Sequence, residues 1–365
     1  MRIAIFKLFN IGDALLLTPT LTALRKGYPN AEITVVTRET NLGILQGCPA
    51  IDHLVGMSDP REPGSSALLH DIRAILNLRR TRFDYLFELS GRQRGRNLAA
   101  LCRTCRAYSV RTIQPLSGLR RLQFDAVAAH DCRRGHLVER DFFSVHEFLP
   151  LPTPIPPLVF DREYSRAWSG ADGLDSFAVL QVGTREGFKR WHADGWRKLA
   201  QHLLERLPNL VVTSGTAPDE VAEAEALHDC FGSRIILTRG KTTWPELADL
   251  LYRTTLYVGL DTSVTHLAAA CQCPIVALCG PTVEEIWEPW QAQHHMVTTR
   301  DFHITEEDRQ SDGYPAQRRR RMSNVLPEDV IAACDDLLKN GPVSTRVEAE
   351  SSPCKSSFGK GFAIS

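Results

Sequence analysis

The sequence predicts an α/β protein made of two doubly wound domains that face each other. Short apolar runs alternate with helical patterns along most of the 365 residues, which is typical of parallel sheets covered by helices on both faces. The proline-rich stretch PLPTPIPP at 150–157 interrupts this rhythm. Because proline fixes φ and donates no hydrogen bond, we expect an extended, stiff linker there. We therefore place one Rossmann-like domain at residues 1–160 and a second at 175–340.

The first half contains the elements of one such domain. Short β-branched or aromatic runs bounded by turn residues predict strands at 2–8, 32–38, 51–57 and 83–90. Apolar residues at helical spacing predict helices at 68–80 and 136–149.

The second half repeats the alternation. Strands are predicted at 177–183, 209–215, 233–238, 255–260 and 274–280, and helices at 195–208, 219–231, 244–254, 263–272 and 326–338. The segment 291–324 breaks the rhythm, and is either a loop over a cleft or a solvated insertion. Residues 341–365, rich in Ser, Gly and Lys, predict a disordered tail.

Composition limits the class of protein. No stretch approaches the roughly 18 uncharged residues of a membrane span, and the N-terminus MRIAIFKL lacks a signal-peptide pattern. We expect a cytoplasmic protein in which the ten cysteines are free thiols. Neither the CxxC at 102–105 nor the CxC at 271–273 has the second pair that a zinc site needs, so no metal site is predicted.

Polar residues follow several of the predicted strands, where doubly wound sheets bind ligands. Asp261, Thr262 and Ser263 sit between a strand and a helix, and His266 lies one turn further on. Helix N-termini bind phosphate, so this segment is a candidate phosphate site. The same three residues would also form an ordinary N-cap cluster.

Two further loops carry candidate ligand-binding residues. Lys189 and Thr184 follow the strand at 177–183. Lys189 could bind a diphosphate there, or it could be an ordinary surface lysine beside Trp191. Glu220 follows the strand at 209–215. It could accept hydrogen bonds from ribose hydroxyls, or only occupy the first turn of a helix, where acids are favoured. No GxGxxG, GxSxG or HExxH motif is present.

Asp13 lies after the first strand, in FNIGDALLLTPTL (9–21). It could cap a helix, yet Thr18-Pro19 offers a second helix start, and a helix beginning at Asp13 would enclose Pro19. At the edge of a cleft its carboxylate could instead act as a base. We expect Gly12 to let the chain turn there.

Three blocks in this order resemble the signature regions of glycosyltransferase family 9, the bacterial ADP-heptose:lipopolysaccharide heptosyltransferases and their relatives. They are FNIGDALLLTPTLTALRKGYP, GTREGFKRW and VGLDTSVTHLAAACQCPIVALCGPT, and the match extends over roughly residues 1–340. The resemblance implies a GT-B fold, with the active site in the cleft between the two Rossmann-like domains. It implies inverting transfer, with heptose from ADP-heptose moving to the inner core of lipopolysaccharide.

The resemblance also implies roles for individual residues. Asp13 would be the general base, and Lys189 would contact the donor diphosphate. Asp261 and Thr262 would meet the nucleotide and its phosphates, with His266 close by. Ser263 stands where the family usually has glycine, which bears on how closely the donor approaches the backbone. Because Lys189 and a helix N-terminus can stabilise the leaving diphosphate, we expect no metal cofactor.

An anionic acceptor should meet the first domain, where residues 70–134 hold 14 arginines and five acids. Arg92, Arg94 and Arg96 are the candidate acceptor-binding residues, because guanidinium groups pair bidentately with phosphate and carboxylate. Alternatively, these arginines form an ordinary solvent-exposed basic surface without a binding role. Nucleic acid is not expected, since the run lacks interleaved aromatics and any motif of that class. A glycolipid acceptor also raises the prospect of peripheral contact with the cytoplasmic face of the inner membrane.

Three other functions stay open at this stage. The protein could be a family relative that uses another nucleotide sugar for a different cell-surface glycan. It could be a GT-B nucleotide-sugar epimerase, which needs no acceptor. It could also be a sensing protein that lost the chemistry, although the presence of Asp13, Lys189, Asp261 and His266 argues against this.

Overall fold

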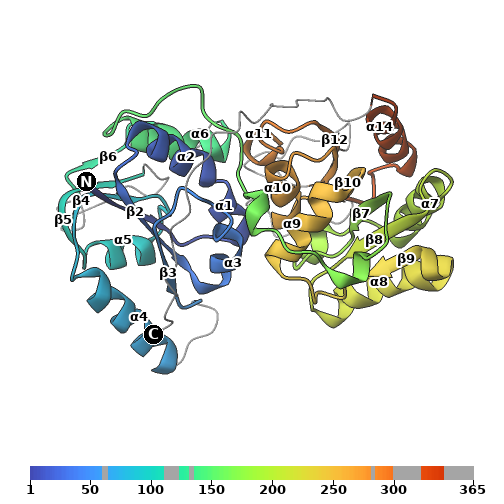
Figure 1. The fold of residues 1–365 in the computed structure, drawn as a ribbon, viewed down its shortest axis with the longest axis horizontal. Helices are drawn as coiled ribbons and strands as arrows, with labels where there is room; N and C mark the ends of the chain where they lie inside the picture. Colours follow the sequence, from blue (N-terminus) through green and yellow to red (C-terminus); the bar gives the residue numbers. More distant parts are fainter. Residues whose placement is uncertain (60–64, 111–122, 131–134, 281–283, 299–321, 341–365) are drawn as a thin grey trace, which may run out of the picture.

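A computed structural model describes residues 1–59, 65–110, 123–130, 135–280, 284–298 and 322–340. It contains two six-stranded sheets, one in each of two lobes that lie side by side (Figure 1). All the strand pairs are parallel. The fold class predicted from the sequence, two doubly wound α/β domains, is confirmed.

The first sheet has the order β3-β2-β1-β4-β5-β6. Its strands are β1 (Arg2–Lys7), β2 (Glu32–Arg38), β3 (His53–Met57), β4 (Arg82–Glu88), β5 (Arg103–Ser109) and β6 (Ala126–Val127). The chain order reverses between β1 and β4, so the crevice at the carboxyl end of β1 is the expected ligand position.

The second sheet has the order β12-β11-β10-β7-β8-β9, which repeats the topology of the first when read from β9. Its strands are β7 (Phe177–Gln181), β8 (Asn209–Thr213), β9 (Ile235–Leu237), β10 (Leu256–Leu260), β11 (Ile275–Cys279) and β12 (His294–Thr298). Here the order reverses between β7 and β10, so the loops after these two strands should meet a ligand.

Burial on both faces of the sheets explains the near-continuous apolar strands. In β1, Ile3 and Ile5 belong to one hydrophobic cluster, and Ala4 and Phe6 belong to another on the opposite face. Every residue of β7, β10 and β11 is buried. Such strands cannot alternate apolar and polar residues, as strands with one solvated face do.

Helices connect the strands of both sheets. Those of the first lobe are α1 (Ile11–Leu15), α2 (Thr18–Gly27), α3 (Leu42–Leu45), α4 (Ser65–Leu78), α5 (Gln93–Ala99) and α6 (Leu137–His146). Those of the second lobe are α7 (Ala193–Leu204), α8 (Pro218–Phe231), α9 (Trp244–Arg253), α10 (Ser263–Ala270), α11 (Glu284–Trp287) and α14 (Pro327–Asn340). No helix in the described ranges is long and apolar enough to span a bilayer.

The structure adds elements that the sequence patterns did not predict. Strand β12 lies inside the segment 291–324, which was expected to break the βα rhythm. As the edge strand of its sheet, β12 is mostly half-buried, so its polar residues hide the strand pattern. Strand β5 and helix α5 were missed for a similar reason, since polar residues and arginines interrupt the apolar pattern in both. The predicted tail at 341–365 and most of the segment 291–324, including the arginine-rich residues 317–321, lie outside the described residues.

The proline-rich segment at 150–157 and several side chains join the two lobes. Trp290 donates its indole N–H to the backbone carbonyl of Pro156 at 3.0 Å, and Nε2 of His136 lies 2.9 Å from the carbonyl of Glu288. Between α3 and α9, a Cβ on Gly43 would lie only 2.9 Å from Trp244 Cδ1. These contacts hold the carboxyl edges of the two sheets opposite each other.

Candidate active site

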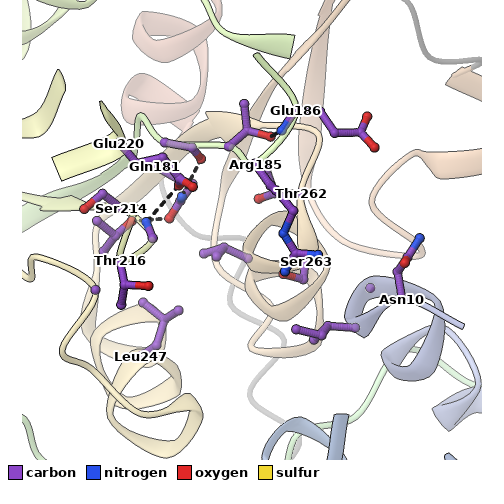
Figure 2. Close-up of a pocket in the computed structure, with 18 of the residues that line it drawn as sticks. Asn10, Gln181, Arg185, Glu186, Ser214, Thr216, Glu220, Leu247, Thr262 and Ser263 are labelled. Carbon is purple, nitrogen blue, oxygen red and sulfur yellow. Dashed lines mark hydrogen bonds between the residues drawn. The ribbon is translucent and has the colours of Figure 1, made fainter. Parts of the chain in front are cut away.

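The carboxyl ends of β1, β7, β8 and β10 border a cleft between the lobes. One part of it has a volume of about 510 Å³ and is lined by loops of both sheets. A second part, of about 300 Å³, shares Asn10, Gly12, Lys189 and Asp261 with the first. Figure 2 shows Asn10 of the first lobe facing Thr262 and Ser263 of the second. The cleft thus lies where the strand order of each sheet reverses.

Asp13 lies in the third position of α1, a five-residue helix whose N-cap is Asn10. Its Oδ2 accepts the backbone N–H of Asn10 at 3.2 Å, while its buried Oδ1 has no hydrogen-bond partner among the described residues. Burial raises the pKa of Asp13 to about 6, although the positive charge of Lys7 opposes this shift. The carboxylate therefore braces the helix start with one oxygen and leaves the other for a ligand.

Of the two helix starts considered for this segment, only the one at Thr18-Pro19 is confirmed, because α1 begins at Ile11 and not at Asp13. Helix α1 ends at Leu15, and α2 begins at Thr18 with Pro19 in its first turn. The sequence allowed Asp13 to be the N-cap of this helix, but Asn10 occupies that position. Pro19 costs no internal hydrogen bond, since the first N–H groups of a helix lack intrahelical partners.

Gly12 packs against the opposite lobe. A Cβ there would lie 3.1 Å from Cδ2 of His266 and 3.6 Å from the Cα of Ser263. Gly12 is not among the glycines with positive φ. The expectation that it permits a turn is therefore wrong, and glycine is required here for close approach between the lobes.

His266 is buried in α10 and lines the cleft beside Asp13. Burial lowers its pKa to about 4, so the imidazole is neutral near pH 7. Its Nδ1 has no hydrogen-bond partner in the described part of the chain. Its ring contacts Gly12, so it fixes how closely α1 and α10 approach.

Lys189 and Asp261 form an ion pair across the point where the second sheet reverses its strand order. The Lys189 Nζ donates to Asp261 Oδ2 at 2.9 Å and to the Asp261 carbonyl at 3.3 Å. Burial alone would lower the pKa of Lys189, but the charge of Asp261, its hydrogen bond to Lys189 and the nearby Glu186 together outweigh burial, and the pKa is raised. The ammonium group is therefore charged and faces the cleft.

Helix α10 presents its N-terminus to the cleft. Thr262 is the N-cap, yet its side chain makes no capping hydrogen bond, and Ser263 is the first helical residue. Amide N–H groups of the first turn are thus not satisfied by the cap, and helix N-termini favour anions. This geometry supports the phosphate interpretation of the Asp-Thr-Ser segment over the N-cap interpretation.

Glu220 joins two of the loops that line the cleft. It lies in the first turn of α8, and its Oε2 accepts the Gly215 N–H at 3.0 Å (Figure 2). A Cβ on Gly183 would lie 2.6 Å from the same oxygen. Thr184 is buried next to Gly183, and its Oγ1 accepts the Glu186 N–H at 3.4 Å. Both predicted residues line the cleft, and Glu220 also braces the loop after β8.

Several cleft residues were not singled out from the sequence. Arg38, Thr40 and Trp244 line the cleft, the first two at the end of β2. Thr216 and Leu247 lie across the cleft from Asn10 (Figure 2). The available signal was their position just after predicted strands or at a helix start. Residue type alone did not distinguish them from ordinary loop residues.

The three predicted acceptor-binding arginines line neither part of the cleft. Arg94 donates to Asp71 at 2.7 Å and to the Ser58 carbonyl at 2.8 Å. Arg96 is buried, with its Nε 3.8 Å from Glu88. Arg92 is exposed, and its guanidinium carbon lies 4.7 Å from the centre of the Phe9 ring. Of the three, Arg92 has the side chain that is open to a ligand near the start of α1.

Within the ranges that the structure describes, no group of three or more His, Cys, Asp or Glu side chains is placed to hold a metal ion.

Comparison with known proteins identifies the family. The sequence model of glycosyltransferase family 9 (heptosyltransferase) matches residues 73–314. Lipopolysaccharide heptosyltransferase 3 of Escherichia coli K12 is 28% identical over 343 residues, which cover 90% of this chain and 95% of that protein.

Two solved structures show the same fold. The glycosyl transferase family 9 structure from Veillonella parvula superposes with a TM-score of 0.79 at 21% identity, covering 93% of this chain and 98% of that one. E. coli heptosyltransferase WaaC with ADP gives a TM-score of 0.75 at 18% identity, covering 92% and 100%. The fold is therefore GT-B, as the resemblance implied. Because the family match spans more than half of the sequence, the chain belongs to glycosyltransferase family 9 and is a glycosyltransferase.

Proposed function

We propose that the enzyme transfers heptose from ADP-heptose to a hydroxyl of an inner-core lipopolysaccharide acceptor, with inversion at the anomeric carbon. The family supports heptose as the sugar, and the name of the E. coli relative supports lipopolysaccharide as the acceptor. The ADP in the WaaC structure supports an adenine nucleotide as the leaving group.

The observation that carries this proposal is the position of Asp13. Its buried Oδ1 has no hydrogen-bond partner among the described residues, and Asp13 lines one cavity with Lys189, Asp261 and the first residues of α10. An acceptor hydroxyl between them would lose its proton to Oδ1 as its oxygen bonds to the anomeric carbon. At the same time the bond from that carbon to the diphosphate breaks, and the electron pair leaves with ADP. Attack from the side opposite the diphosphate inverts the centre.

The second lobe would stabilise the leaving diphosphate. Lys189 supplies a charge, and the N–H groups at the start of α10 supply dipoles aimed at the cleft. The Ser263 hydroxyl adds a donor where the family usually has glycine. We propose that these groups neutralise the developing charge and that catalysis is metal-independent.

The remaining predicted residues fall at the two ends of the bound substrates. Thr184 and Glu220 lie along the wall that would hold the nucleotide, where the Glu220 carboxylate can accept from ribose hydroxyls while bracing Gly215. On the opposite lobe, Arg92 is the arginine of the predicted set that we assign to the anionic acceptor. Its guanidinium lies over the ring of Phe9, so Arg92 is next to the segment that leads into α1.

A thermal-shift panel tests the donor. ADP-sugars should raise the melting temperature of the enzyme, and UDP- and GDP-sugars should not, because only ligands of the folded state stabilise it. Stabilisation by UDP- or GDP-sugars alone would refute the ADP-heptose assignment.

Product analysis tests the reaction. Incubation with donor and acceptor should give the glycosylated acceptor, and donor alone should give no new sugar isomer. A new isomer formed from donor alone would show an epimerase, the alternative that the fold also permits. Asp13→Asn should bind donor normally and lose transfer.

A further inference from the structure

Helix α4 carries an exposed apolar stripe that the fold does not use. Leu68, Leu69, Ile72 and Leu76 are 63%, 54%, 45% and 59% exposed. Helical periodicity places Leu68, Ile72 and Leu76 on one face, with Leu69 beside them. Large apolar side chains gathered in one patch mark an interaction surface more often than single exposed ones do.

A neighbouring face of α4 anchors the helix. Ile75 and Leu78 are buried in the cluster that covers one side of the first sheet. Asp71 also faces inward, accepting from Arg94 at 2.7 Å and from the Ser58 N–H at 2.8 Å. The exposed stripe is therefore not needed to hold α4 in place.

Most of the charged residues on and near α4 are arginines, although the exposed Asp84 lies in β4 close to Arg82. Asp71 is the one carboxylate in the sequence of α4, and it is paired internally. Arg73, Arg79 and Arg80 are exposed on the helix and directly after it. Arg82 and Arg103, also exposed, are neighbours where β4 and β5 begin. Apolar residues flanked by arginines are typical of helices that lie in the interface of an anionic membrane.

Figure 1 shows α4 at the outer edge of the first lobe, away from the second lobe and the interlobe contacts. A flat surface could meet this edge without blocking the cleft. A second copy of the chain is a poorer partner, because a symmetric contact would place the same arginines opposite one another. We propose that the Leu68–Leu69–Ile72–Leu76 face of α4 docks the enzyme on a bilayer containing anionic phospholipid.

Vesicle flotation of the full-length protein tests this proposal. Wild type should float with vesicles of phosphatidylcholine and phosphatidylglycerol, bind weakly to phosphatidylcholine alone, and detach as ionic strength rises. The double variant Leu68→Ser/Leu76→Ser should bind at least tenfold more weakly, since each aliphatic side chain contributes on the order of tenfold. Arg73→Ala/Arg80→Ala should weaken binding about fivefold per arginine and flatten the salt dependence.

The matched control is Tyr164→Ser/Leu326→Ser, which removes two similarly exposed side chains from other parts of the surface. It should float like wild type. Equal flotation of the α4 and control variants would overturn the proposal. So would a wild-type dimer that Leu68→Ser/Leu76→Ser converts to monomer, because the stripe would then be covered by a second copy.

Activity separates this proposal from the proposed function. Leu68→Ser/Leu76→Ser should transfer sugar to a soluble acceptor fragment at the wild-type rate, and should lose rate on the same acceptor embedded in anionic vesicles. Loss on the soluble fragment would mean that the stripe serves the fold or the site, and would overturn membrane docking. Failure of wild type on any lipopolysaccharide acceptor would refute the acceptor assignment, with the flotation result unaffected.

Discussion

The rate of transfer should fall at a pH set by Asp13. If this carboxylate is the base, only its ionised form supports the reaction, and burial raises its pKa to about 6. A raised pKa means that the ionised form is lost early as pH falls. The acid limb of the profile should therefore lie about two pH units above that of an ordinary, solvated aspartate.

The size of the effect follows from the titration curve. With a pKa of about 6, roughly one tenth of Asp13 is ionised at pH 5, so the rate should be roughly one tenth of its plateau. An aspartate near its ordinary pKa of about 3.9 would still be roughly nine tenths ionised at that pH. The two cases thus differ about ninefold at a single pH.

The assay is kcat/KM for the acceptor measured from pH 4.5 to 8.5, because this quantity reports the pKa of the enzyme before the acceptor binds. Folding is checked at each pH by circular dichroism. Glu88 supplies the control, because burial raises its pKa to about 7 although it lines neither part of the cleft. Glu88→Gln should leave the acid limb in place, and Asp13→Asn should reduce the rate at every pH. A wild-type rate at pH 5 above half the plateau would refute the reasoning, as would near-normal transfer by Asp13→Asn.

Three other outcomes test the donor side of the cleft. Lys189→Ala should weaken ADP binding by about 10- to 100-fold in calorimetry, since a hydrogen bond to a charged group contributes about 1.5–3 kcal/mol. Lys198→Ala, at an exposed position of α7, is the control and should leave ADP binding unchanged. Gly183→Ala should raise the donor KM and lower the melting temperature, because the new Cβ would lie 2.6 Å from Glu220 Oε2. Gly187→Ala is the control and should behave like wild type, because there is open space around its Cβ. Transfer after exhaustive EDTA treatment should stay within about twofold of the untreated rate, and a loss restored by Mg²⁺ would contradict metal-independent catalysis.

The apolar strands made most of the fold predictable. Strands buried on both faces, such as β1 and β7, appear in the sequence as short apolar runs with clear boundaries. Elements at the margins of the sheets do not have this signal. β12 is half-buried at an edge, and β5 begins with exposed residues, so neither contains a run that periodicity can detect.

The sequence predicted which loops form the candidate site better than it predicted the contacts that their side chains make. Asp13, Lys189 and Asp261 follow strands whose carboxyl ends must meet a ligand, and the structure brings all three to one cavity. The arginines show the opposite case. Their number predicted an anion site, but the burial of Arg96 beside Glu88 and the pairing of Arg94 with Asp71 depend on how α5 packs against β4 and α4.

The sequence by itself determined the family, the two doubly wound domains and the segments that line the cleft, because strand burial and strand-end loops are local properties of the chain. Tertiary structure alone decided what each residue in those segments contacts. Gly12 serves the close approach of His266 rather than a turn, and Asp13 meets Asp261 and His266 at one cavity. Such contacts join residues some 250 positions apart, and no local pattern encodes the distance between them.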